Sequence, residues 1–151
     1  MVLVNAPVAR DNPAHHGVRL AIDMQVAVQS LANRWYARGY GMGFGVGIAM
    51  GPATVGTVGY EGRLDYTAIG NVVNLASRLC DSADDAQILV DAVIAGKVKD
   101  SVALVSLGKR IIKGYDHALQ VFAVAHSDAT VVGYPDCRLQ QPRLDLVKLA
   151  V

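Results

Sequence analysis

Apolar and polar positions in the first quarter of the chain follow the pattern of a short strand and then a long amphipathic helix. Residues 2–4 are consecutive apolar residues that stop at a polar, proline-containing turn. Asn12 and Pro13 suit the N-cap and the first position of a helix. Apolar side chains then recur at roughly helical spacing as far as Arg38, at Val18, Ile22, Val26, Leu31 and Trp35. The pattern therefore predicts a helix over 13–38, which the following glycines end.

The rest of the chain alternates short apolar segments with two shorter helical patterns. The helices are expected over 70–80 and 91–97. Strands are expected over 44–50, 53–59, the segment that ends at Ile69, 87–90 and 102–107, with a hairpin of 109–112 and 119–125 that turns at 113–115. Strands and helices that alternate through short connections are typical of α/β and α+β proteins.

Composition and charge narrow the class of protein. The hydrophobic fraction is 52% and the mean hydropathy is +0.30, which favours a compact globular domain. The net charge of +1 provides no long-range field for nucleic acid or for an anionic membrane, and no apolar run approaches the roughly 20 residues that span a bilayer. The two cysteines, Cys80 and Cys137, form no metal-binding pair, and the start is not that of a signal peptide. We therefore expect a cytoplasmic protein with no nucleic-acid or membrane partner.

One stretch carries candidate chemistry. Asn74 and Arg78 are four residues apart on the predicted helix that begins at Gly70-Asn71, so their side chains share a face. An amide, a guanidinium fork and a helix N-terminus together suit a phosphate group. Taken alone, such a pair is more often a first-turn amide and a solvated arginine. Its surroundings are unusual, however: Val46-Gly-Ile-Ala-Met-Gly-Pro52, Val55-Gly-Thr-Val-Gly59 and Leu64-Asp-Tyr-Thr-Ala-Ile-Gly-Asn-Val-Val-Asn-Leu-Ala-Ser-Arg-Leu79.

These residues closely resemble the catalytic domain of the class III adenylyl and guanylyl cyclases, in their bacterial form. The resemblance covers residues 1–125 and leaves 126–151 as a tail outside it. It implies an α+β, ferredoxin-like sheet with helices on one face, which lacks the family's first strand and the helices that follow. It also implies that Asn74 and Arg78 orient the ribose and stabilise charge that develops at the α-phosphate, a type of contact that can contribute about 10²–10³ in rate.

Three further positions match substrate-binding positions of the family. Thr67 stands where the purine is read, and a hydroxyl there can accept and donate hydrogen bonds. The alternative is a β-branched residue that packs in a strand. Lys113 resembles the lysine that contacts the terminal phosphates, although an exposed turn lysine is an equally ordinary feature. Arg63, in the loop that precedes Leu64, is a further candidate for phosphate contact.

The resemblance also implies Mg²⁺ or Mn²⁺, bound in the family by one Asp on the first strand and another in a Gly-Asp hairpin. Both would lie upstream of Met1, so we expect no metal ligands within this chain. Asp11, Asp23 and Asp65 do not stand at matching positions.

Family members work as dimers in which one subunit supplies the aspartates and the other supplies the Asn, Arg, Thr and Lys positions. The expected reaction is ATP to cyclic AMP and pyrophosphate, with GTP less favoured, and we expect negligible turnover from this chain alone. The alternative is a non-catalytic nucleotide-binding or dimerisation partner of an intact cyclase chain; a decayed relic is the third possibility. Loss of a central strand would leave a gap in the sheet, to be filled by a strand-swapped oligomer or by the apolar tail 144–151.

Overall fold

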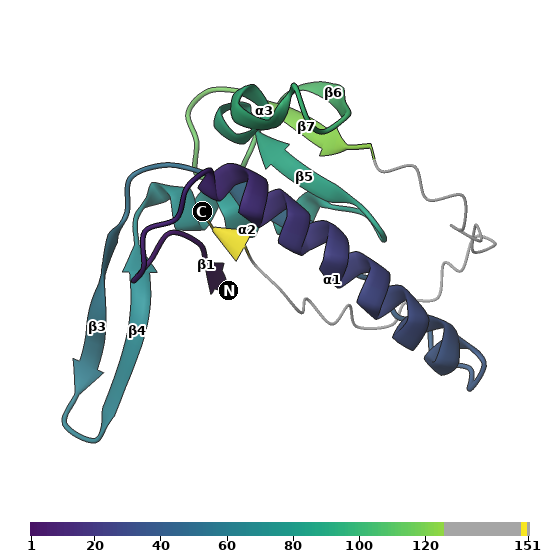
Figure 1. Cartoon of the computed structure of the whole chain (residues 1–151), viewed down its shortest axis with the longest axis horizontal. Coiled ribbons are helices and arrows are strands. Elements are labelled where there is room, and N and C mark those ends of the chain that lie inside the picture. Colours follow the sequence, from purple (N-terminus) through teal and green to yellow (C-terminus); the bar gives the residue numbers. More distant parts are fainter. Residues whose placement is uncertain (126–148, 151) are drawn as a thin grey trace.

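The computed structural model describes residues 1–125 and 149–150 of the chain. Three helices and eight strands lie in these ranges (Figure 1). In chain order they are β1 (Val2–Leu3), α1 (Pro13–Tyr36), β2 (Val46–Ala49), β3 (Thr54–Tyr60), β4 (Arg63–Ile69), α2 (Asn71–Ser82), β5 (Ile88–Asp91), α3 (Ala92–Val98), β6 (Leu104–Arg110), β7 (Leu119–Val124) and β8 (Leu149–Ala150).

Six strands form one mixed sheet in the order β1-β8-β2-β5-β7-β6. The first four of these run parallel to one another, whereas β7 is antiparallel to both β5 and β6. β3 and β4 form a separate two-stranded antiparallel ribbon. Parallel and antiparallel strands combined with three helices confirm the predicted α+β class.

The sheet position between β1 and β2 is filled by the C-terminal end of the chain. Leu149 and Ala150 pair with Val2 and Leu3 on one side and with Ile48 and Ala49 on the other. Of the two expectations for this gap, insertion of the chain's own tail is the one that the structure shows. The preceding part of the tail, 126–148, and Val151 lie outside the described residues.

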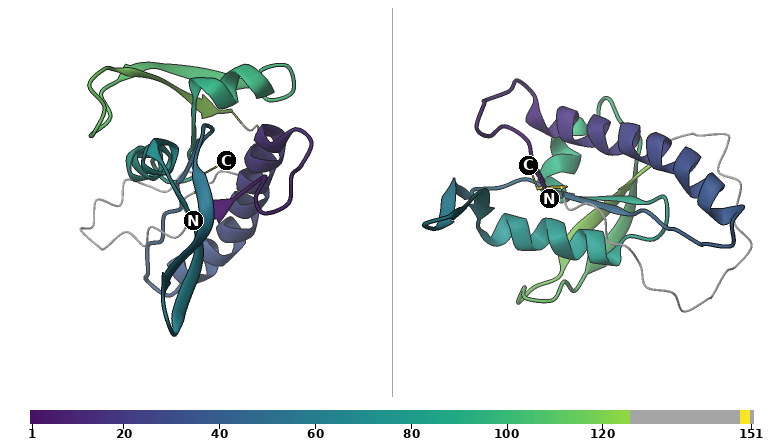
Figure 2. Two further views of the ribbon diagram at one scale, coloured as in Figure 1. Left: turned by 90° about the vertical axis from the view of Figure 1, so that its left-hand side faces the viewer. Right: turned by 90° about the horizontal axis from the view of Figure 1, so that it is seen from below.

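The helices divide between the two faces of the main sheet, where the sequence analysis expected them on one (Figure 2). Alternate residues of β2 account for this arrangement. Ile48 belongs to the apolar cluster that α1 and α3 cover, whereas Ala49 belongs to the cluster that α2 covers. A methyl group at Gly47 would overlap the backbone nitrogen of Cys80 on α2, so only glycine lets this helix lie directly on the strand.

The β3–β4 ribbon extends away from the rest of the molecule (Figure 1). Its strands pair over their full length, from Thr54 opposite Ile69 to Tyr60 opposite Arg63. The turn is therefore only Glu61-Gly62, shorter than predicted, and Gly62 adopts φ +96, which favours glycine. Large apolar side chains are exposed along the ribbon, among them Val58, Tyr60, Leu64 and Tyr66. A two-stranded ribbon is only marginally stable by itself, and exposed apolar side chains of this kind are typical of interaction surfaces.

The C-terminal part of the sheet differs from the prediction in one respect. The two strands predicted over 102–107 and 109–112 are a single strand, β6, because the chain continues through an irregularity between Ser106 and Lys109. Gly108, at this irregularity, has φ +76. A glycine that resembles a break in the sequence can instead form a bulge within one strand.

Candidate functional site

α2 carries the two candidate catalytic residues on its exposed face. Val72, Ala76, Leu79 and Cys80 are the buried residues of this helix. Asn74 and Arg78 project from the opposite side and are exposed. The Nη1 atom of Arg78 donates to Asp81 Oδ2 at 3.3 Å, one turn further along the helix. The amide and the guanidinium therefore stand side by side toward solvent, with one carboxylate that competes for the guanidinium.

A loop between β6 and β7 brings Lys113 to the start of the same helix. Ile112 is buried against α2, and Tyr115 packs in the same cluster. The phenol Oη of Tyr115 donates a 2.8 Å hydrogen bond to the carbonyl oxygen of Asn71, in the first turn of α2. Lys113 itself is exposed. The loop is thus anchored on both sides of Lys113, at Ile112 and at Tyr115, and the second anchor joins it to the first turn of α2.

The structure places the other two candidates on β4, which leads into α2. Thr67 is half-buried near the base of the ribbon, and its cross-strand partner is Gly56. A Cβ atom at Gly56 would meet nothing within 4 Å, so this side of Thr67 is uncovered. Arg63 stands at the ribbon tip and pairs with Asp65 at 3.5 Å. At about 3.3 Å per residue it lies roughly 20 Å along the strand from Ile69, so the structure does not bring it to α2 within one chain.

A cleft of about 420 Å³ opens beside the N-terminus of α2. Residues 3–6, 50–53, 55, 68, 72 and 73 line it. None of the five candidates lines the cleft, although Thr67 and Asn74 are direct chain neighbours of Ala68 and Val73, which do. The cleft therefore lies next to the backbone at Thr67 and Asn74, whose side chains are not part of its lining.

Asp91 is a residue that the sequence analysis did not single out. It is 8% exposed and ends β5, where Oδ1 accepts from Ile94 N at 2.8 Å and Oδ2 accepts from Met50 N at 3.3 Å. Burial raises the pKa of this carboxyl group above its ordinary 3.8, and the backbone hydrogen bonds oppose the rise. Burial, followed by the nearby Asp91 charge, raises the pKa of Tyr115 above 10.0. An Asp before a short helix is a recognisable N-cap, so the sequence contained the signal for Asp91.

The described residues do not fit a divalent metal. In residues 1–125 and 149–150 no three His, Cys, Asp or Glu side chains stand close enough to share an ion. Asp23 pairs with Arg19 and Asp65 with Arg63, both at the surface. The only buried carboxylate in these ranges, Asp91, is engaged by two backbone N–H groups.

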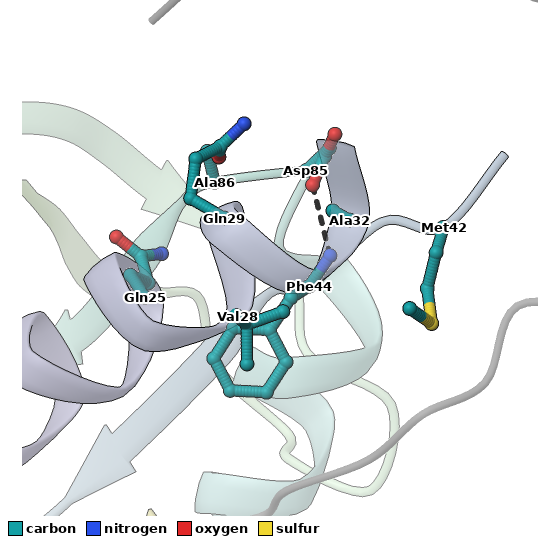
Figure 3. Close-up of a pocket in the computed structure, with 8 residues that line it drawn as sticks. All are labelled: Gln25, Val28, Gln29, Ala32, Met42, Phe44, Asp85 and Ala86. Atoms are coloured by element: carbon teal, nitrogen blue, oxygen red, sulfur yellow. Dashed lines mark hydrogen bonds between the residues drawn. The ribbon is translucent and has the colours of Figure 1, made fainter. Parts of the chain in front are cut away.

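A second hollow lies under α1 and belongs to the core rather than to the site (Figure 3). Its volume is about 10 Å³, which leaves room for no more than a water molecule. Gln25 lines it and is 6% exposed, and neither polar atom of its amide has a partner among the described residues. Asp85 closes another side by accepting from Phe44 N at 2.8 Å.

Among the helices of the described ranges, each is too short or too polar to cross a bilayer.

Comparison with known proteins gives the family. The profile of the adenylate and guanylate cyclase catalytic domain matches residues 1–125. "Adenylate cyclase 1" of Rhizobium meliloti (strain 1021) is 35% identical over 123 residues, which are 80% of this chain and 18% of that protein.

Solved structures agree. The adenylyl cyclase CyaB from P. aeruginosa superposes with a TM-score of 0.70 at 27% identity, over 83% of this chain and 66% of that one. The guanylate cyclase domain of RhGC from Catenaria anguillulae, solved with GTP, has a TM-score of 0.68 over 81% of this chain and 64% of that one; at 20% identity it supports the fold alone. The chain spans about a fifth of the curated relative and just under two thirds of these structures. By profile, sequence and fold, this chain belongs to the adenylate and guanylate cyclase catalytic domain family.

Proposed function

We propose that this chain binds a purine nucleoside triphosphate, ATP in preference to GTP, and supplies one half of a cyclase site that a second polypeptide completes. The observation that carries the proposal is the exposed pair Asn74 and Arg78 on α2, next to a loop that Tyr115 ties to the first turn of the same helix. Three polar groups of the types that bind ribose and phosphate thus come from two segments held together by one hydrogen bond.

The proposed reaction is cyclisation of ATP. The ribose 3′-oxygen forms a bond to the α-phosphorus, the bond from that phosphorus to the pyrophosphate oxygen breaks, and the 3′-hydroxyl proton passes to solvent. Arg78 would stabilise the charge that develops at the α-phosphate, and Asn74 would orient the ribose. Lys113 would contact the terminal phosphates, and Thr67 the purine edge.

A second polypeptide is proposed because the site is open. Asn74, Arg78 and Lys113 are all exposed on one chain, whereas catalysis of this kind requires donors that are shielded from water. The apolar side chains exposed on the β3–β4 ribbon favour association next to the same region, since β4 leads directly into α2. A homodimer, or a pair with an intact cyclase chain, would cover both the exposed polar residues and the apolar side chains of the ribbon.

The carboxylates that hold the family's Mg²⁺ or Mn²⁺ would then come from that second polypeptide, and we propose negligible turnover for this chain alone. Support comes from the described residues, in which no acidic cluster fits a metal. When bound, the ions would activate the 3′-hydroxyl and neutralise the leaving pyrophosphate.

Nucleotide titration with and without Mn²⁺, followed by product analysis, tests the proposal. We expect ATP binding that depends little on Mn²⁺, exceeds GTP binding in affinity, and is lost in Asn74→Ala and Arg78→Ala. No cyclic AMP should form until a cyclase lacking its own Asn and Arg positions is added. Cyclic AMP at ordinary rates from the pure chain would overturn the half-site, and unchanged ATP affinity in both variants would overturn the binding site. Binding without turnover in every mixture would favour the non-catalytic alternative.

A further inference from the structure

Gly56 is a glycine that the fold of this chain does not require. It lies inside β3, where a glycine weakens a strand. Its φ is not positive, and the pairing with β4 runs from Thr54 to Tyr60 without a shift, so no bulge calls for it. A Cβ atom added there would meet nothing within 4 Å. Within the described part of the chain, the position is open to any side chain.

Two nearby glycines differ from Gly56 in this respect. A methyl group added at Gly47 would overlap the backbone of α2, and one added at Gly59, also on β3, would overlap the carbonyl oxygen of Arg63 on β4. The chain's own backbone therefore requires both. A strand glycine without such a reason often marks a place where a ligand or another backbone comes close.

Gly56 and Thr67 share the face of the ribbon that points away from the cleft. Val55 and Ala68 are cross-strand partners, and both line the cleft. Side chains alternate along a strand, so the next pair, Gly56 and Thr67, faces the opposite side. Directly opposed residues have Cβ positions about 4.5–5.5 Å apart. The open space over Gly56 is therefore immediately beside the Thr67 side chain.

The same face offers apolar surface on either side of this pair. Val58, two residues further along β3, is 48% exposed, and Ile69, two residues further along β4, is 59% exposed. Thr67 between them is half-buried. The result is a gap at Gly56 with apolar side chains at both ends and a hydroxyl-bearing side chain across from it. A purine, apolar on its faces and polar at its edge, matches this surface.

We propose that Gly56 is a specificity-determining residue of the nucleotide site, because its missing side chain makes room for the purine ring. The ring lies over the Gly56 backbone with its polar edge at Thr67. This placement rests on the proposed function, which assigns the purine to Thr67. A larger residue at position 56 would exclude the base and leave the phosphate contact at Arg78 intact, since Arg78 belongs to α2.

Titration of full-length variants with ATP and with inorganic tripolyphosphate, both without Mn²⁺, tests this role. In Gly56→Val we expect ATP affinity to fall roughly tenfold or more, and in Gly56→Ala to fall less, because bulk then enters the base's space. Tripolyphosphate affinity should not change in either variant, whereas Arg78→Ala should weaken both ligands. The midpoint of urea unfolding should stay the same or rise, since the position is open and unstrained.

Thr57→Ile is the matched control, because it adds bulk to the same strand on the opposite face. It should change neither affinity. Unchanged ATP affinity in Gly56→Val, with binding still lost in Arg78→Ala, would overturn the role of Gly56 and leave the half-site standing. Equal losses of ATP and tripolyphosphate would overturn it too, because the effect would not then be at the base.

Light scattering separates the base from a partner chain. A different oligomeric state in Gly56→Val than in the wild type would show that another polypeptide approaches Gly56, and the role in purine selection would fail. If Arg78→Ala left the binding of both ligands unchanged, the proposed function itself would fall.

Discussion

The phenol of Tyr115 donates a 2.8 Å hydrogen bond to the carbonyl oxygen of Asn71, 44 residues earlier in the chain. This bond joins the loop that bears Lys113 to the helix that bears Asn74. Because Lys113 is itself exposed, its position relative to the helix depends on the anchors beside it.

Tyr115→Phe should therefore loosen this loop. Loss of one neutral hydrogen bond costs about 0.5–1.5 kcal/mol, so we expect ATP affinity to fall roughly two- to tenfold, with a similar change in the free energy of unfolding. Calorimetric titration measures the first and urea unfolding the second. Tyr60→Phe, on the exposed ribbon, is the matched control and should change neither. Unchanged affinity in Tyr115→Phe would mean that Lys113 does not need the anchor.

Asp81→Ala should tighten nucleotide binding. Its carboxylate accepts from Arg78 at 3.3 Å in a partly exposed pair, so phosphate has to compete with it. Exposed pairs contribute about 0.2–1 kcal/mol, and we expect an affinity gain of roughly two- to fivefold at low salt. The control is the double variant Asp81→Ala, Arg78→Ala, which should show neither the gain in affinity nor the binding itself. A weaker affinity in Asp81→Ala would show that the carboxylate positions Arg78 instead of competing for it.

Gly47→Ala should strongly destabilise the protein. The new methyl group would overlap backbone atoms of Ala76 and Cys80, so α2 would have to move off the sheet. We expect a cost of about 3 kcal/mol or more in urea unfolding. Gly96→Ala is the control: nothing lies within 4 Å of its added methyl, and it should stabilise α3 by about 0.5–1 kcal/mol. Equal stability of the two variants would contradict the close approach of α2 to β2.

The buried carboxyl group of Asp91 should make the free energy of unfolding fall as the pH rises. Burial raises its pKa in the folded protein, so folding favours the protonated form. The associated stability is complete below the ordinary pKa of 3.8 and is lost as the pH rises through the higher folded value. Urea unfolding at intervals from about pH 3.5 to 7 should show this loss in the wild type but not in Asp91→Asn. Parallel curves for the two proteins would contradict the assignment. Asp91→Ala, which lacks both accepting oxygens, should cost about 1–2 kcal/mol at the low-pH end of this range, where the wild type is most stable, and less as the pH rises.

Gln25→Met should raise thermal stability. The buried amide of Gln25 has no partner among the described residues, and such a group costs about 1–3 kcal/mol. Each kcal/mol recovered should raise Tm by roughly 2–4 °C in a calorimetric scan. Gln29→Met is the control, because Gln29 is hydrogen-bonded to Asn33. A lower Tm for Gln25→Met would reveal a polar partner in the intact protein.

Local pattern is sufficient for most elements. The apolar spacing predicts α1, and the structure places Asn12 at the N-cap and Pro13 in the first turn, although Asn12 has φ 52 and its side chain makes no capping bond. The sequence wrongly predicts a strand boundary at Gly108, because a glycine with φ +76 can form either a bulge or a break, and only the pairing with β7 distinguishes them.

The local part of the candidate site is likewise predictable from the sequence, whereas its long-range contacts are not. The helical period alone puts Asn74 and Arg78 on one exposed face, and this follows from residue spacing on any helix. The sequence indicates no more than a turn at Tyr115, because the bond of its phenol to Asn71 is not a local property. The sequence offers Arg63 as a candidate phosphate contact. Neighbouring residues do not reveal how far the ribbon tip lies from α2, so only the structure shows that the two are distant within one chain.

The amino-acid sequence by itself determined the helices, the strands and the shared face of Asn74 and Arg78, since each depends on residues within a few positions of one another. Tertiary structure decided which face of the sheet α2 covers, that Asp91 accepts from Met50, and that Leu149–Ala150 lies between β1 and β2. These relationships join residues about 40 to nearly 150 positions apart, and they arise from backbone groups and apolar surfaces that must find partners in the interior. Periodicity along the chain carries no record of which distant segment will supply them.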